Sequence, residues 1–186
     1  SEVQAIYSGG TGAPAASVTT TNLQIYTPLD SVIATNLLQQ GGRLAPGTSA
    51  GTDGVGTTLV YGDYDAAAGA IYEIEIDGPG SSDLLDIAGS ATLQDGFILD
   101  VLFAGYQPVP GDVFQVLTAA DIDVDLDALV IQSAYGGFLR EIIAGGNGEI
   151  LQLTYVPEPG TLVLLALGGL CMAGCWWRRK RPEAAR

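Results

Sequence analysis

Apolar and polar residues alternate with a period of two along much of this chain, which is the pattern of half-buried β-strands. In residues 72–77, Tyr72, Ile74 and Ile76 fall on one side of an extended chain, and three acidic residues fall on the other. Residues 121–127 repeat the pattern with four aspartates against three aliphatic residues. Because like charges disfavour pairing with another acidic strand, we expect both acidic faces to point into water.

Segments with strand character recur regularly from residue 41 onward, about every 10–15 residues, and each ends at Gly, Asp or Asn. They cover residues 57–64, 70–77, 83–93, 96–102 and 112–117. The pattern predicts an all-β domain over residues 41–155.

Residues 1–40 are less regular. The stretch rich in Gly, Ala and Thr at residues 9–21 predicts a loop, and residues 23–26 predict a first short strand. Asp30 or Ser31 could cap a short helix over residues 32–40. We therefore treat residues 1–40 as an irregular N-terminal segment with a short strand and a short helix.

The C-terminal region has a different composition. Residues 161–177 carry no charge, and as a helix they would measure about 25 Å, near the lower limit for crossing a bilayer. Two tryptophans end this span and four basic residues follow it, in the order of an aromatic belt and a positive stop, namely Trp176, Trp177, Arg178, Arg179, Lys180 and Arg181. The positive-inside rule predicts a cytoplasmic tail at residues 178–186 and a body on the other side of the membrane.

A Pro-Glu-Pro sequence precedes this apolar span, within Val156, Pro157, Glu158 and Pro159. In this order, residues 156–181 resemble the PEP-CTERM sorting signal that exosortases read in Gram-negative, exopolysaccharide-producing bacteria. The resemblance implies export, transient anchoring and cleavage near the prolines. The alternative is a permanent membrane anchor. Because proline disfavours helix in the residue before it, we expect residues 156–160 to form an extended linker.

The body resembles the repetitive passenger regions of autotransporter-type adhesins. The resemblance covers residues 41–120 and rests on residues 44–51, 60–64, 83–87 and 111–114. It implies a short parallel β-solenoid, with room for some four to six rungs at about 20–25 residues each. A β-sandwich of the same strands is the alternative.

The charge of the body excludes one class of partner. Residues 1–155 contain only two basic residues, Arg43 and Arg140, against 19 acidic ones, a net charge of −17. Nucleic-acid binding is excluded, because neutralising phosphates requires Lys and Arg. Both cysteines, Cys171 and Cys175, lie in the apolar span, so the body can form no disulfide.

The body also lacks the side chains of common catalytic and zinc sites, since it contains no His, Cys or Lys. Glu73 and Glu75 have the spacing of a carboxylate pair that could hydrolyse a glycoside, but nothing else marks a sugar cleft. We therefore expect no enzymatic activity and no cofactor.

Two segments resemble parts of calcium-binding motifs. Asp121, Asp123 and Asp125 match the first ligands of an EF-hand loop, but Leu126 replaces the required Gly and Gln132 replaces the final Glu. Residues 145–150 are similar to one copy of a calcium-binding solenoid repeat, whose sites are shared between successive turns. We predict no specific metal site.

The sequence thus predicts an exported structural or surface protein held in the inner membrane by one span, with its N-terminal domain outside the cytoplasm. Release to the cell surface would follow processing. The expected partners are the lipid bilayer and an exosortase. In the alternative function, the chain is an accessory single-span subunit whose β domain covers the periplasmic face of other membrane-protein subunits.

Overall fold

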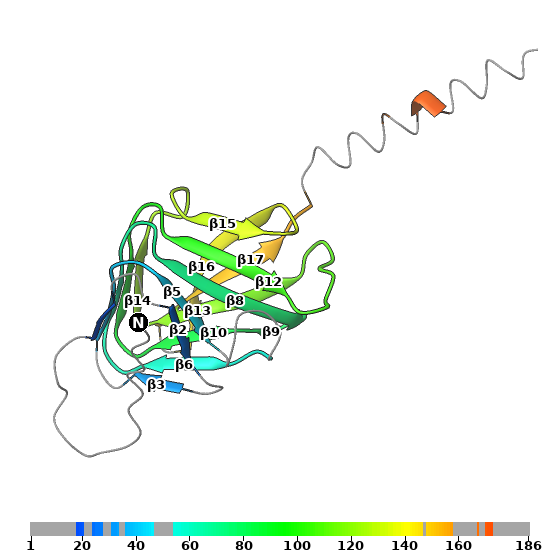
Figure 1. The fold of residues 1–186 in the computed structure, drawn as a ribbon. Helices are drawn as coiled ribbons and strands as arrows, with labels where there is room; N and C mark the ends of the chain where they lie inside the picture. The colour runs from blue at the N-terminus through cyan, green and yellow to red at the C-terminus, as the bar shows by residue number, and fades with distance from the viewer. Residues whose placement is uncertain are drawn as a thin grey trace, which may run out of the picture.

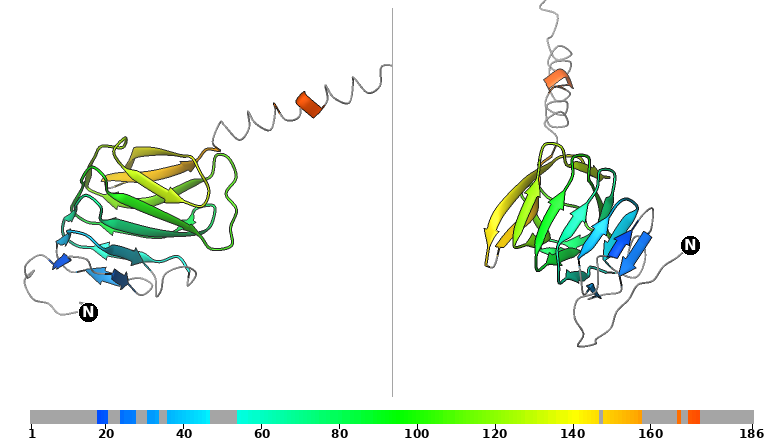
Figure 2. Two further views of the ribbon diagram at one scale, coloured as in Figure 1. Left: turned by 45° about the horizontal axis from the view of Figure 1, so that its top comes forward. Right: turned by 90° about the vertical axis from the view of Figure 1, so that its left-hand side faces the viewer.

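The computed structural model describes residues 18–20, 24–27, 31–33, 36–46, 54–146, 148–157, 167 and 170–172. Strands make up nearly all the regular structure of these residues (Figure 1). The chain winds through three parallel sheets in turn, so that each sheet receives one strand per turn (Figure 2). The predicted all-β solenoid is confirmed, and the sandwich alternative is wrong.

The three sheets are named here by the order in which the chain enters them. Sheet A contains β1 (Val18–Thr20), β4 (Leu37–Gln39), β7 (Tyr64–Ala66), β11 (Ser90–Leu93) and β14 (Asp121–Val124). Sheet B contains β2 (Gln24–Thr27), β5 (Arg43–Pro46), β8 (Ile71–Gly78), β12 (Ile98–Phe103) and β15 (Val130–Ser133), with β9 (Ser81–Ser82) beside β8. Sheet C contains β3 (Ser31–Ile33), β6 (Thr57–Val60), β10 (Leu84–Ile87) and β13 (Val113–Ala119), followed by β17 (Gly148–Tyr155) and β16 (Phe138–Gly145).

The strand register defines the length of a turn. Leu37 pairs with Tyr64, and Tyr64 pairs with Ala91, so two successive turns are each 27 residues long. The next turn is 31 residues, from Ala91 to Ile122, and the N-terminal turn is 19, from Val18 to Leu37. The regular turn is therefore longer than the predicted 20–25 residues, because the connection between sheets B and C is long.

The core is a stack of side chains that point inward from equivalent positions of successive turns. Sheet A contributes Leu37, Tyr64 and Ala91, all at most 1% exposed. Sheet B contributes Leu44, Tyr72 and Leu99 in the same way, with Phe97 near the corner between the two sheets. Since no single turn could bury these side chains alone, each turn depends on its neighbours for its core.

An antiparallel hairpin ends the solenoid. β17 pairs antiparallel with β13, and β16 pairs antiparallel with β17, so sheet C continues where a further parallel turn would lie. Leu151 and Leu153 of β17 are fully buried. Gly148 allows the approach, since a Cβ there would lie 2.1 Å from the carbonyl oxygen of Ala119.

Three predictions about the N-terminal part and the acidic faces differ from the structure. The range predicted as a short helix, 32–40, contains β3 and β4, because stacking on β6 and β7 favours extended backbone there. Strands of the solenoid already occur at residue 18, well before residue 41. Glu73 and Glu75 do not face open water, being only 2% and 3% exposed, whereas Asp121, Asp123, Asp125 and Asp127 are exposed as predicted.

The predicted membrane helix falls mostly outside the described residues. Of residues 161–177, the structure describes only Leu167 and 170–172, which have helical backbone and exposed side chains. Within the part of the chain that is described, no helix is both long enough and apolar enough to span a bilayer.

Candidate functional site

The chain leaves the folded body at the end of β17. The Tyr155 amide donates to the carbonyl of Asp112 at 2.8 Å, and the Tyr155 carbonyl accepts from the Gly111 amide at 2.9 Å. The next residue, Val156, donates its amide to the carbonyl of Gly137 at 2.9 Å. The exit is therefore held between the loop before β13 and the loop before β16 (Figure 1).

Aromatic rings pack beneath this exit. The rings of Tyr155 and Phe138 lie 5.6 Å apart, and Phe138 stacks on Phe103 at 6.4 Å. Phe103 also meets the edges of Tyr135 and Phe114, at 5.0 and 6.2 Å. These contacts connect β12, β13, β16 and β17, so the end of β17 leaves the body from a well-packed base.

The first two residues beyond this base, Val156 and Pro157, have no regular secondary structure. Val156 is 43% exposed, and Pro157 is half-buried. The other predicted motif and anchor residues lie outside the described residues, namely Glu158, Pro159, Trp176, Trp177, Arg178, Arg179, Lys180 and Arg181.

The family comparison fits this position in the chain. The family model of the PEP-CTERM protein-sorting motif matches residues 156–180, starting one residue after β17 ends. The chain carries a PEP-CTERM sorting signal. This signal implies an exported protein that is sorted by an exosortase. No curated protein and no solved structure matches the chain, and the likeness of its body to autotransporter passenger regions stays a prediction.

A group of charged residues crosses the outer face of sheet B, upstream of the PEP-CTERM signal. Nη1 of Arg43 on β5 pairs with Glu73 on β8 and with Asp100 on β12, the latter at 2.7 Å. Burial alone would lower the pKa of the Arg43 guanidinium, but the hydrogen bonds and charges of Asp100 and Glu73 outweigh it and raise the pKa. One of the two arginines of the body therefore neutralises acids on adjacent turns.

Among the residues that the structure describes, Asp83 is a carboxylate with no exposed surface. Its Oδ1 accepts from the Gly56 amide at 2.7 Å and its Oδ2 accepts from the Glu75 amide at 2.8 Å. Burial raises the pKa of the Asp83 carboxyl to about 7, the two backbone hydrogen bonds lower it, and the charges of Glu75 and Glu73 raise it further. Asp83 thus fastens the connection between sheets B and C.

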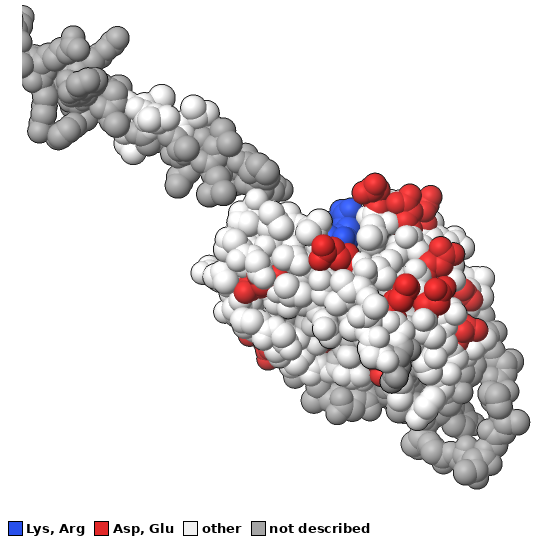
Figure 3. Space-filling model, turned by 180° about the vertical axis from the view of Figure 1, so that it is seen from behind, with Lys and Arg blue, Asp and Glu red and all other residues white. Residues whose placement is uncertain are grey.

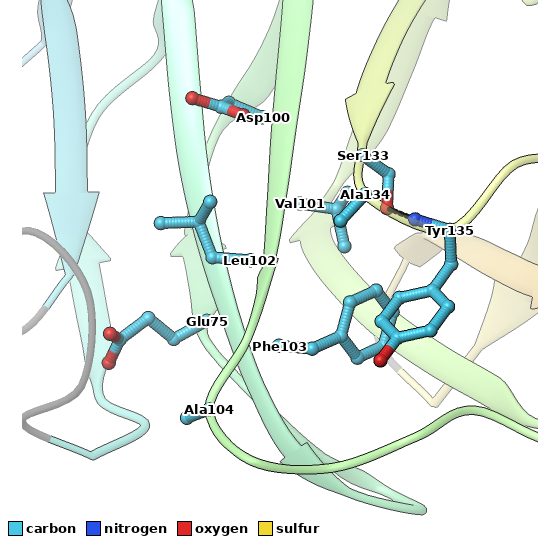
Figure 4. Close-up of a pocket in the computed structure, with 9 residues that line it drawn as sticks. All are labelled: Glu75, Asp100, Val101, Leu102, Phe103, Ala104, Ser133, Ala134 and Tyr135. Carbon is cyan, nitrogen blue, oxygen red and sulfur yellow. Dashed lines mark hydrogen bonds between the residues drawn. The ribbon is translucent and has the colours of Figure 1, made fainter.

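A hollow of about 430 Å³ opens beside the C-terminal end of β12 (Figure 4). Glu75 and Asp100 lie on one side of β12, and Ser133 and Tyr135 lie on the other. Asp100 is paired with Arg43, and Glu73, which we considered with Glu75 as a hydrolytic pair, is also paired with Arg43. The carboxylates of Glu73 and Asp100 are therefore used for contacts between turns.

The segments with partial calcium motifs have other contacts. Asp125 begins a turn, with its Oδ1 accepting from the Asp127 amide at 2.9 Å. Glu149 lies in the β16–β17 hairpin and its Oε2 accepts from the Ile122 amide at 2.7 Å, so residues 145–150 do not form a solenoid repeat. Among the residues that the structure describes, no three His, Cys, Asp or Glu side chains gather as metal ligands would.

The aromatic base of the exit was not predicted from the sequence. The signal was present, because six of the twelve Phe and Tyr residues lie between residues 103 and 155. Aromatic residues so close to a sorting signal indicate a reinforced end of the domain.

Proposed function

We propose that this protein is an exported, membrane-anchored structural protein of the cell surface. Its β-solenoid stands outside the cytoplasm, and residues 161–177 hold it in the inner membrane until an exosortase acts. Residues 178–186 form the cytoplasmic tail.

The observation that carries the proposal is that the PEP-CTERM signal begins directly at the end of the folded body. Tyr155 is the last residue of β17, and the matched signal begins at Val156. Only five residues, 156–160, separate the last strand from the uncharged span. The signal is therefore an appendage to a complete solenoid end, and removing it would leave the hairpin and its aromatic base intact.

A role without catalysis is supported by the chemistry of the body. No residue from 1 to 155 is His, Cys or Lys. Glu73 and Asp100 are paired with Arg43, and Asp83 is fully buried. The repeated sheets instead offer a rigid spacer.

Replacement of Pro157, Glu158 and Pro159 by alanine tests the proposal in a host that has an exosortase. We expect the natural chain to lose the mass of its tail and to leave the inner membrane, and the variant to keep its full mass and remain there. The matched control replaces Gln132 and Ala134, two exposed residues of the body outside the signal, by serine.

Equal mass and equal location of the variant and the natural chain would overturn the proposed sorting. A natural chain that stays uncut and copurifies with other membrane proteins would instead support the accessory-subunit function.

A further inference from the structure

Four of the exposed apolar residues of the body lie where the chain leaves it, whereas Tyr61, Val130 and Ile143 are exposed elsewhere. Val109, Val113, Leu139 and Val156 are between 40% and 56% exposed, and we call these four residues the exit patch. Val113 and Leu139 are both Cα partners of Thr154, so their side chains lie on the same outer face of sheet C. Val109 lies in the turn whose Gly111 amide donates to Tyr155. The patch therefore surrounds the last residues of β17.

Most of the exposed acids lie on sheet A or at its corners, away from the exit patch. Among the described residues, Asp65, Asp121 and Asp123 lie on sheet A, and Asp63, Asp95, Asp125 and Asp127 lie at its two corners. The remaining exposed acid, Asp77, is at the end of β8. In Figure 3 most of the visible acidic side chains lie away from the point where the chain leaves the body.

The two carboxylates nearest to the exit patch are held by hydrogen bonds. Asp112 accepts from the Tyr106 hydroxyl and from the Val109 amide. Glu141 accepts from the Gln152 amide group at 3.0 Å. Both carboxylates therefore have partners within the folded body, so neither stands beside the patch as an isolated charge.

The length of the linker decides what can cover this patch. Five residues, 156–160, lie between β17 and the uncharged span, and fully extended they reach at most about 18 Å. An anchored body therefore cannot move its exit far from the lipid headgroups. Anionic headgroups would repel the acidic sheet A.

We propose that the exit patch rests on the lipid surface of the membrane, with sheet A turned away from it. This inference rests on the proposed anchoring of the chain. It adds a defined orientation, in which the body itself holds Val156 and Pro157 at the membrane interface. The partner is the zwitterionic and anionic phospholipid surface, and the contact is apolar.

Site-specific fluorescence on the full chain tests this orientation. In a background with Cys171→Ser and Cys175→Ser, single cysteines at Leu139→Cys and Asp123→Cys carry an environment-sensitive dye. The labelled chain is reconstituted in vesicles of phosphatidylcholine and phosphatidylglycerol, with and without lipids that bear a quenching nitroxide. We expect a several-fold greater loss of emission at position 139 than at position 123.

Substitutions within the patch test the orientation without moving the dye. Val109→Asp with Val113→Asp should abolish the difference between the two positions, while Gln115→Asp, next to the patch on β13, should leave most of it. All these chains should still float with the vesicles.

The outcomes separate this inference from the function on which it rests. A chain that does not float with vesicles overturns both the anchoring and the orientation. A chain that floats but is quenched equally at both positions overturns the orientation alone. A blue shift at position 139 that persists in detergent and rises with protein concentration, without quenching by lipid, would assign the patch to a second copy of the chain.

Discussion

Asp83 connects two turns of the solenoid through a single side chain, and its environment favours the protonated form. Its carboxyl is fully buried and accepts a hydrogen bond from the backbone amide of Glu75. This burial raises the pKa of the carboxyl from an ordinary 3.8 to about 7. The folded state therefore binds a proton more tightly than the unfolded chain. Its contribution to stability is full below about pH 4 and is lost as the pH rises through about 7.

Replacement of Asp83 by asparagine should remove this dependence. We expect the midpoint temperature of unfolding of the natural chain in detergent to decrease as the pH is raised from 5 to 8. The midpoint temperature of Asp83→Asn should decrease less over the same range. The variant should also be less stable at every pH. The NH₂ group of the asparagine side chain is a donor, and it would face a backbone amide that is also a donor. Thermal unfolding followed by circular dichroism at several pH values gives, for each chain, the slope of the midpoint temperature against pH. Equal slopes would show that Asp83 does not titrate in this range.

The corner between sheets C and A repeats the same contacts on successive turns. Asn36 Oδ1 accepts from the Asp63 amide at 2.9 Å, and Asp63 Oδ1 accepts from the Ser90 amide at 2.9 Å. The backbone amide of Gly89 donates to the carbonyl of Gly62 at 3.1 Å. Short polar side chains and glycine are used here because the backbones of neighbouring turns approach closely.

Gly89→Ala tests how closely the two turns must pack at this corner. A Cβ at Gly89 would lie 2.3 Å from Asp63 Oδ1 and 2.8 Å from the carbonyl oxygen of Gly62, so the two turns must separate. We expect a loss of about 2 kcal/mol in the free energy of unfolding, as for overpacking in general. Gly78→Ala is the matched control, because a Cβ there meets no atom within 4 Å. Denaturant unfolding of both variants measures the difference, and equal stability would show that the corner yields at little cost.

The molecule as a whole combines a strongly acidic body with a basic tail. The body carries a net charge of −17, and four consecutive basic residues, 178–181, follow the uncharged span. Positive charge beside a span is retained on the cytoplasmic side. This separation of charge sets the expected topology of the chain.

Thiol labelling of spheroplasts tests this topology in a host without exosortase. With Cys171→Ser and Cys175→Ser as background, Asp95→Cys in the body should react with an impermeant maleimide on intact spheroplasts. Glu183→Cys in the tail should react only after lysis, which makes it the control for membrane integrity. The reverse pattern would mean an inverted chain.

The alternation of residues determined the strands of this protein and the composition determined its charge. Tyr72, Ile74 and Ile76 point inward as their spacing predicts, since side chains of a strand alternate between its two faces whatever the fold. The sorting signal was also readable, because its proline pair, uncharged span and basic stop are contiguous in the chain. Contiguous features need no tertiary information.

Only the tertiary structure decided how the turns stack and what covers each outward face. The alternation of residues placed Glu73 on the face opposite the core. It could not reveal that Arg43, 30 residues earlier and on the neighbouring strand of sheet B, would pair with Glu73. Residues 32–40 could have formed a helix capped by Asp30 or Ser31, yet pairing with β6 and β7 holds β3 and β4 extended. The 27-residue turn, the antiparallel hairpin and the exit patch all depend on contacts between distant residues. Such contacts form only when neighbouring turns bury each other, which local spacing does not encode.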